Sequence, residues 1–203
     1  MGRQERPSQD LNPAALEALA FASHGRRVLP VYGIKGGECR CRFGERCDRP
    51  GKHPRINRPY QNSTSDIARI LKWAAAKPDS NWAWVPGRSN HAVVDVDQRN
   101  GGSESLLSLV AEYGSFPDTE TVQTGDGTHH VFKVRPGDQI AACQIAAGLE
   151  LKTGSSSYVM IPHSRHFSGR EYTYEVGYEF PLIDPVTCPH DRIHSLSRFS
   201  DQL

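Results

Sequence analysis

The spacing of apolar residues predicts three helices. The first begins at Asn12 and Pro13, an N-cap followed by a proline at the first helical position, and ends at Gly25. The second follows a capping sequence at 63–66, and the third opens at Ser103. Residues at helical spacing are expected to form one face of each helix, in order Leu16, Leu19, Ala20 and Ser23; Ile67, Ile70, Leu71 and Ala74; and Leu106, Leu107, Val110 and Tyr113.

Short apolar or alternating runs predict strands before, between and after these helices. A Pro-Gly turn at 86–90 separates two of them. Helices mixed with mostly antiparallel strands are typical of an α+β domain, which is the fold class that we predict. The predicted strands cover residues 28–32, 82–85, 91–97, 119–124, 129–134, 149–152, 158–161 and 171–176.

Residues 33–60 have no apolar period, and a stretch of this length is too long for a plain loop in a compact domain. It contains three thiols and an imidazole, Cys39, Cys41, Cys47 and His53, which can close a tetrahedral zinc site. Metal binding would supply the folding energy that the stretch otherwise lacks. Four protein ligands leave no open position, so we expect a structural zinc. The alternative is free thiols on a loop without order.

Composition and length fit one globular domain with a small attachment. The chain has 203 residues, of which 37% are hydrophobic, and a net charge of +1. No run of about 20 apolar residues could cross a membrane, and the N-terminus lacks the apolar region of a secretory signal. We therefore predict a cytoplasmic protein that does not bind membranes. Its five cysteines are an odd number, which favours metal ligation over a disulfide scaffold.

The charges are distributed unevenly. Residues 35–58 hold eight Lys or Arg against three acids, a local charge of +5, whereas residues 95–150 hold three bases against nine acids, a local charge of −6. An acidic centre beside a basic segment suits cations on one side and phosphates on the other, although solvated surfaces can produce the same clusters.

The clearest acidic pair is Asp95 and Asp97, which end the strand at 91–97. Residues i and i+2 of a strand point to the same face. Two carboxylates so near to each other repel unless a cation lies between them. Mg²⁺ or Mn²⁺ would suit such a pair, with water and substrate phosphate completing its shell. A solvated strand end is the alternative. Glu150, between two leucines on a later strand, taken alone reads as an exposed alternating residue.

A glycine-containing turn and two histidines follow. The glycines of Thr124-Gly125-Asp126-Gly127 allow a close approach of the backbone, and a histidine just after them can reach a phosphate. Alternation puts His130 and Phe132 on one face of the strand, and His129 and Val131 on the other. A lone histidine on a strand is more often structural than functional.

These motifs, in this order, resemble the bifunctional primase-polymerase domain of the archaeo-eukaryotic primase superfamily over about residues 14–175. The order of the motifs makes the set specific. The matching segments are Gly51-Lys52-His53-Pro54, Thr64-x-Asp66, Val94-Asp95-Val96-Asp97, Thr124-Gly125-x-Gly127-x-x-His130, Gly148-Leu149-Glu150-Leu151-Lys152, Tyr158-Val159-x-x-Pro162-x-Ser164 and Gly169-x-x-Tyr172. The chain departs from the family pattern at Thr128, Glu150, Lys152 and His163, which stand where glycine, aspartate, arginine and proline are usual.

The resemblance implies an RRM-like catalytic palm, an N-terminal α/β unit and an inserted zinc-binding loop. It implies a template-directed DNA primase and polymerase of a phage, plasmid or similar element, which adds nucleotides to a 3′-hydroxyl. Asp95, Asp97 and Glu150 would hold two Mg²⁺ or Mn²⁺ ions. The residues implied in binding the nucleoside triphosphate are His130, Thr128, Lys152, Ser164 and His166. Single-stranded template and primer would lie along the basic segment, and a helicase could act downstream.

The expected organisation is a flexible tail at 1–11, a catalytic domain at 12–180 that includes the zinc loop at 33–60, and an irregular segment at 181–203. Cys188, His190 and His194 could form a second metal site. Two rival functions remain open. One is a Toprim or other palm-like nucleotidyl enzyme, although Toprim domains place a glutamate before the acidic pair. The other is a non-catalytic zinc-binding nucleic-acid module.

Overall fold

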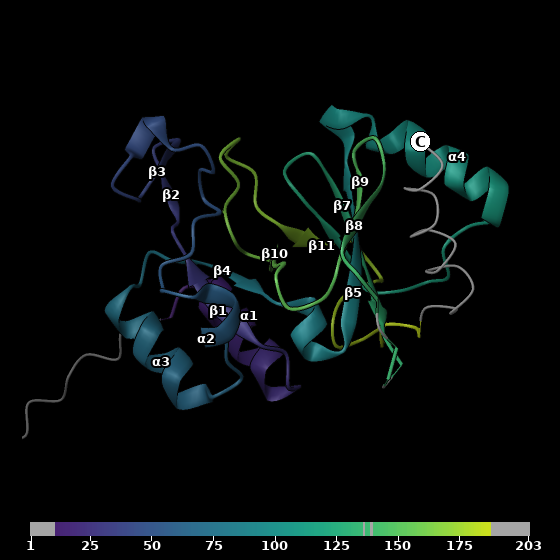
Figure 1. Cartoon of the computed structure of the whole chain (residues 1–203). Coiled ribbons are helices and arrows are strands. Elements are labelled where there is room, and N and C mark those ends of the chain that lie inside the picture. The colour runs from purple at the N-terminus through teal and green to yellow at the C-terminus, as the bar shows by residue number, and fades with distance from the viewer. Residues whose placement is uncertain (1–10, 136, 139, 188–203) are drawn as a thin grey trace, which may run out of the picture.

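The computed structural model describes residues 11–187 except 136 and 139 (Figure 1). Residues 1–10 of the expected tail and the candidate metal site at Cys188, His190 and His194 lie outside the described residues. The helices are α1 (Pro13–Ser23), α2 (Pro59–Asn62), α3 (Ile67–Ala76) and α4 (Gly102–Tyr113), with 3-10 helices η1 (Gly44–Arg46), η2 (Pro86–Ser89) and η3 (Gln98–Asn100). The strands are β1 (Val28–Val31), β2 (Ile34–Lys35), β3 (Glu38–Cys39), β4 (Asn81–Trp84), β5 (His91–Asp97), β6 (Thr121–Gln123), β7 (Gly127–Lys133), β8 (Cys143–Ala146), β9 (Leu149–Lys152), β10 (Val159–Met160) and β11 (Thr173–Tyr174).

The strands form two main sheets, and Figure 1 shows them side by side. The smaller has the order β1-β4-β10 and packs against α1 and α3; the larger has the order β11-β6-β7-β5-β9-β8 and carries α4 on its outer face. All paired strands within these sheets are antiparallel. The predicted α+β class is confirmed. No helix of the described part of the chain is both long and apolar enough to cross a membrane.

The central strand β5 divides its residues between two environments. Ala92, Val94 and Val96 are buried on the face covered by α4, whereas Val93 packs into the core under α1. Asp95 and Asp97 share the face of Val93, nearer the end of the strand, where both are partly exposed. One face of this sheet is therefore closed along its length, and the other is closed at one end and open at the acidic end.

The predicted helix positions are confirmed, with Asn12 and Asp66 as N-caps of α1 and α3. The expected helix faces are only partly buried. Helix α1 buries its alanines and Phe21 and leaves Leu16 54% exposed, because small side chains let the helix lie close to β4 and α3. Leu107 of α4 is 69% exposed, and Ile67 and Leu71 of α3 are about 40% exposed. Of the apolar residues expected inward on α3, only Ile70 and Ala74 are buried.

Two features of the sheets were missed or left open by the sequence pattern. Strand β8 was not predicted. Strands β4 and β5 follow each other closely in the chain but belong to different sheets, with η2 between them. The 33–60 stretch has more regular structure than expected, namely the β2–β3 hairpin, η1 and the start of α2. The domain boundaries near 12 and 180 stay a prediction.

Candidate active site

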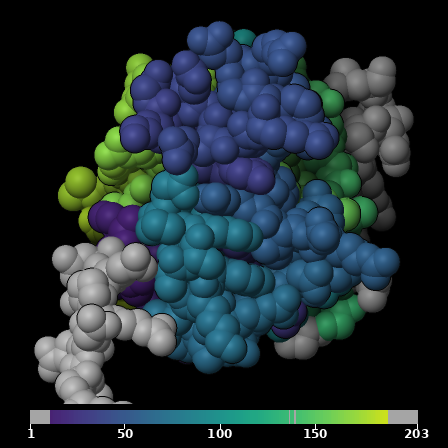
Figure 2. All heavy atoms as spheres, turned by 90° about the vertical axis from the view of Figure 1, so that its left-hand side faces the viewer, coloured from purple at the N-terminus to yellow at the C-terminus, as the bar shows by residue number. Residues whose placement is uncertain are grey.

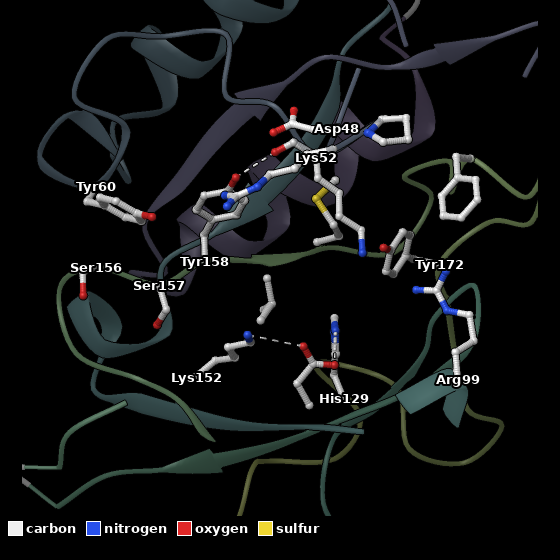
Figure 3. A pocket seen from close by; sticks show the side chains of 16 residues that line it. Asp48, Lys52, Tyr60, Arg99, His129, Lys152, Ser156, Ser157, Tyr158 and Tyr172 are labelled. Carbon is white, nitrogen blue, oxygen red and sulfur yellow. Dashed lines mark hydrogen bonds and ion pairs between the residues drawn. The ribbon is translucent and has the colours of Figure 1, made fainter. Parts of the chain in front are cut away.

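A cavity of about 600 Å³ lies between the 33–60 loop and the acidic end of the larger sheet (Figure 3). Lys52 enters from the loop, Asp95, His129 and Lys152 from the central strands, and Tyr158 from the segment that leads into β10. Four cationic side chains line this cavity, Arg49, Lys52, Arg99 and Lys152, against the two carboxylates of Asp48 and Asp95. The excess of cations suits an anionic ligand.

Asp95 is the acid at the centre of this arrangement. It lies directly opposite His129 on β7 and Glu150 on β9, so that the three side chains share one face. The His129 Nε2 atom is 3.5 Å from Asp95 Oδ1, and the Lys152 ammonium is 3.9 Å from Asp95 Oδ2. Lys152 also contacts the Glu150 carboxylate. The cation therefore lies between two acids that would otherwise repel each other.

Asp97 lies at the mouth of the strand and is held by its own chain. Its carboxylate accepts hydrogen bonds from the backbone N–H of Arg99 at 3.1 Å and from Asn100 Nδ2 at 2.8 Å. Among the described residues, the oxygens of Asp95, Asp97 and Glu150 do not all lie within 4.8 Å of one another. The acids share a face and an edge, but they are not yet at the spacing of a closed metal site. Glu150 is also 48% exposed.

His130 and Thr128 lie on the opposite face of the sheet, so the structure does not bring them to the acids. They pair with Val94 and Val96 of β5 and point toward α4. His130 is satisfied there by the hydroxyls of Thr121 and Thr128, at 3.3 and 3.0 Å, and its ring lies 5.3 Å from the ring of Phe116. Burial lowers the pKa of His130 to about 4. The histidine beside Asp95 is His129.

The three cysteines of the loop lie close together. The Sγ atoms of Cys39, Cys41 and Cys47 are all within 4.8 Å of one another, and all three residues are buried. His53 Nδ1 is 4.0 Å from Cys47 Sγ, and its Nε2 is 3.2 Å from Asp48 Oδ1. These four residues supply the donor types of a Cys₃His zinc centre, but His53 lies within 4.8 Å of Cys47 and Asp48 and not of all three thiols. The Asp48 carboxylate lies beside the histidine, where it would fix the orientation of the ring. Burial raises the pKa of the Cys47 thiol to about 12, so the thiolate of Cys47 is disfavoured without a cation.

Comparison with known proteins identifies the family of the chain. The family model described as bifunctional DNA primase/polymerase, N-terminal, matches residues 18–190, which is most of the sequence. This chain belongs to that family. A comparison with curated proteins gave no match. The primase/polymerase family is one of nucleotidyltransferases, which use DNA and nucleotides as substrates and divalent metals as cofactors.

The sequence interpretation of this primase/polymerase domain missed His129. It is buried and its Nδ1 atom has no hydrogen-bond partner among the described residues. Burial lowers its pKa and the nearby Asp95 opposes that shift. The strand register contains the signal that identifies it. Gly127 is paired with Asp97 and His129 with Asp95, so the odd-numbered positions of β7 face the acids.

Lys52 and Arg99 were also missed. Lys52 belongs to the Gly51-Lys52-His53-Pro54 motif, and Figure 3 shows its side chain pointing into the cavity from the side opposite His129. Burial lowers its pKa, and Asp95 partly offsets this effect. Arg99 bridges Asp97 and Asp126, at 3.5 and 3.3 Å, and its guanidinium lies over the Phe167 ring. Only the folded chain brings Lys52 to the acids, whereas Arg99 follows Asp97 by two residues in the sequence.

Of the other expected nucleotide-binding residues in this primase/polymerase domain, Lys152 lines the cavity, but Ser164 and His166 do not. Ser164 is fully buried, and its hydroxyl bridges the N–H and C=O of Trp82. His166 packs over Gly125, where an added Cβ would lie 2.0 Å from its Nδ1, and against Phe167. Ser164 is therefore placed to anchor its segment to β4, and His166 to fix the turn beside the acids.

Proposed function

We propose that this chain is a template-directed nucleotidyltransferase that adds nucleotides to the 3′-hydroxyl of a primer in the replication of a phage, plasmid or similar element. The observation that carries the proposal is the cavity in which Asp95 lies among four cationic side chains. A triphosphate bound with divalent cations needs carboxylates for the cations and basic side chains for its oxygens. Both are present within one cavity, and family membership supports the same chemistry.

Asp95, Asp97 and Glu150 are the residues that would hold Mg²⁺ or Mn²⁺. Their donor atoms fit hard cations. The contacts of Lys152 with Asp95 and Glu150 place a positive charge next to both carboxylates, as a bound cation would. When bound, such ions activate the attacking hydroxyl and neutralise the charge that develops on the phosphates. Binding would release Lys152 from the carboxylates and leave its ammonium free to contact a phosphate oxygen.

The remaining residues of the site orient and enclose the reacting groups. His129 lies against Asp95 from the neighbouring strand and is placed to hold that carboxylate or donate to a phosphate. Arg99 is placed to fix Asp97 at the cavity mouth. The reaction is an in-line attack of the 3′-hydroxyl on the α-phosphorus, in which the new phosphodiester bond forms and the bond to pyrophosphate breaks.

The Cys₃His cluster is proposed to hold a structural zinc. Elemental analysis of purified protein should find one zinc per chain before any substrate is added. A content far below one zinc, with the loop still protected from proteolysis, would contradict this part of the proposal. Cys143 lies in β8, outside the cluster, so Cys143→Ser should leave the zinc content unchanged.

The exposed side of the 33–60 loop is the proposed contact for template and primer. In Figure 2 this loop, drawn in blue-violet at the top of the view, forms a raised lobe beyond α3. Arg42 and Arg46 are exposed on it, and the Arg42 guanidinium stacks on Phe43, which is itself 44% exposed. Phosphate contacts from arginine and stacking on an exposed ring are the usual means of holding single strands.

Primer extension with Mg²⁺ or Mn²⁺ tests the function. The wild-type chain should extend a primer on a single-stranded template, and Asp95→Asn should not, whereas Asp118→Asn, which removes an acid outside the cavity, should extend like the wild type. A wild-type chain that binds DNA but incorporates no nucleotide with either ion would favour the non-catalytic zinc module instead.

A further inference from the structure

We propose that Lys52 binds the phosphates of the incoming nucleotide and that the Cys₃His cluster holds Lys52 in place for this task. The inference rests on the proposed function and gives the metal-binding loop a role in nucleotide affinity. Three observations support it: where the ammonium lies, what it does not contact, and how the backbone on either side is fixed.

The Lys52 side chain reaches the part of the cavity where a phosphate would meet the acids. It enters from the loop side, whereas Lys152 enters from β9, so the two ammonium groups face the same space from opposite walls (Figure 3). Asp95 and Asp97 are close enough to affect Lys52 electrostatically. A triphosphate carrying metal ions would then lie between these two cations, with its ions on the carboxylates.

Lys52 has no ion pair or hydrogen-bond partner for its ammonium within the described ranges, unlike Lys152 and Arg99, which both contact carboxylates. Lys52 is partly buried, and an ammonium withdrawn from water without a partner is costly. An anion that binds in the cavity would supply the missing partner. Arg99 and Lys152 already contact the acids, which leaves Lys52 and Arg49 to a ligand. Of these two, Arg49 is exposed, whereas Lys52 is partly buried. Lys52 also lies near enough to Asp95 and Asp97 to be affected by their charge.

The backbone around Lys52 is fixed by the loop and by residues in and next to the smaller sheet. The Gly51 N–H points to Cys39 Sγ at 3.5 Å, and the Gly51 carbonyl accepts from Asn81 Nδ2 at 3.0 Å. The Lys52 carbonyl accepts from the Tyr158 hydroxyl at 2.7 Å. His53, the next residue, carries the fourth donor of the cluster. Lys52 is thus adjacent to a metal ligand and cannot move far while the cluster is closed.

Gly51 makes this geometry possible. Its φ is +74°, and a Cβ there would lie 2.9 Å from Ile34 Cγ1 and 3.2 Å from the Arg165 carbonyl oxygen. Any larger residue would therefore shift the segment that carries Lys52 without removing a metal ligand. This gives a way to move Lys52 with the cluster intact.

Equilibrium binding of nucleotides without DNA tests the role of Lys52. Lys52→Met should weaken dTTP binding in Mg²⁺ by about 10- to 100-fold, as expected for loss of a charge-assisted contact, and thymidine binding should not change. Lys52→Arg should restore part of the affinity. Lys72→Met, which removes an exposed lysine of α3, should bind dTTP like the wild type. A Lys52→Met variant with wild-type dTTP affinity, or one that loses thymidine equally, would overturn the inference.

Removal of zinc tests the role of the cluster, with dTTP affinity as the readout. The zinc-free wild type should lose as much affinity as zinc-loaded Lys52→Met, and removing zinc from Lys52→Met should cost nothing more. Loss of the circular dichroism signal would mean that zinc-free protein unfolds, and the Gly51→Ala variant is then measured instead. This variant should bind dTTP more weakly than the wild type while retaining one zinc per chain. Unchanged affinity in both would overturn the link.

The outcomes separate this inference from the proposed function. A wild-type chain that neither binds dTTP nor extends a primer contradicts the proposed function itself. A wild-type chain that extends primers, an inactive Asp95→Asn and an unaffected Lys52→Met contradict only the role of Lys52.

Discussion

The two faces of the six-stranded sheet are built from the same strands, but one is a closed apolar face and the other carries the acids. The face toward α4 is closed by apolar side chains, among them Val94, Phe132 and Leu151. The other face is apolar at one end, at Val93 and Val131, and carries the acids and the cavity at the other. The difference arises from what covers each face. A helix lies along one, whereas the small sheet and the 33–60 loop cover the other only in part.

The neighbouring residues His129 and His130 show what this difference teaches. Both are buried enough that desolvation lowers the pKa, yet His130 is satisfied by two threonine hydroxyls and His129 is left with an unpaired Nδ1 beside an acid. A histidine on a strand is therefore informative only once its face is known. If the two faces divide catalysis from stability in this way, substitutions on each face should have distinct effects.

The largest effect is expected at the acidic end. Asp95→Ala and Asp97→Ala should lower nucleotide incorporation by at least about 1000-fold, since each removes a carboxylate that nothing else on this face replaces. Their melting temperatures should stay close to that of the wild type, because both side chains are partly exposed and repulsion between acids is relieved. Incorporation at the wild-type rate by either variant would contradict the metal-binding role.

Glu150 is expected to behave like the two aspartates although it is half exposed. Glu150→Gln keeps the size of the side chain but loses the charge, so incorporation should fall by about 100-fold or more. Single-turnover extension measures this, with Glu104→Gln on α4 as the control for an exposed glutamate. An active Glu150→Gln variant would mean that the third carboxylate lies elsewhere.

The closed face should respond in stability and not in chemistry. Leu151→Ala, whose side chain is buried under α4 between Glu150 and Lys152 in sequence, should lower the free energy of unfolding by about 2–5 kcal/mol. Urea denaturation gives this value. The folded fraction should still incorporate nucleotides within a few-fold of the wild type, and a much larger loss would show that the two faces are not independent.

The adjacent histidines give a matched pair. His129→Asn should lower kcat/KM for the nucleotide by about 10- to 100-fold with a small change in stability. His130→Asn should cost about 1–3 kcal/mol of stability, because it breaks contacts with Thr121 and Thr128, and should leave kcat/KM nearly unchanged. If the two variants exchange these effects, the assignment of the faces is reversed.

The smallest effect is a loss of stability in mild acid. His91 and His130 have folded pKa values of about 4, below the unfolded value of about 6.5, so the unfolded chain binds more protons as pH falls. The stability that these residues contribute is present above pH 6.5 and decreases until about pH 4. Between pH 7 and pH 6 each should cost about 0.7 kcal/mol. His130→Asn should remove about half of this combined loss; an unchanged pH profile would contradict the burial of His130.

Much of the framework could be predicted without the structure. Caps at Asn12 and Asp66, apolar runs and turns predict most helices and strands because these signals are local. The spacing of the cysteines predicts their cluster, since so short a segment can hardly keep them apart. Strand β8 has weak apolar alternation, so the sequence pattern does not predict it.

The sequence alone determined that His129 and His130 point in opposite directions, because alternation is a property of any strand. Only the tertiary structure decided which of them meets Asp95, since that depends on the pairing of β7 with β5. It also decided which side of α1 is buried, because close packing on a sheet favoured alanines over leucines. Lys52 reaches the acids across more than forty residues of chain, and no local pattern encodes a contact that folding alone creates.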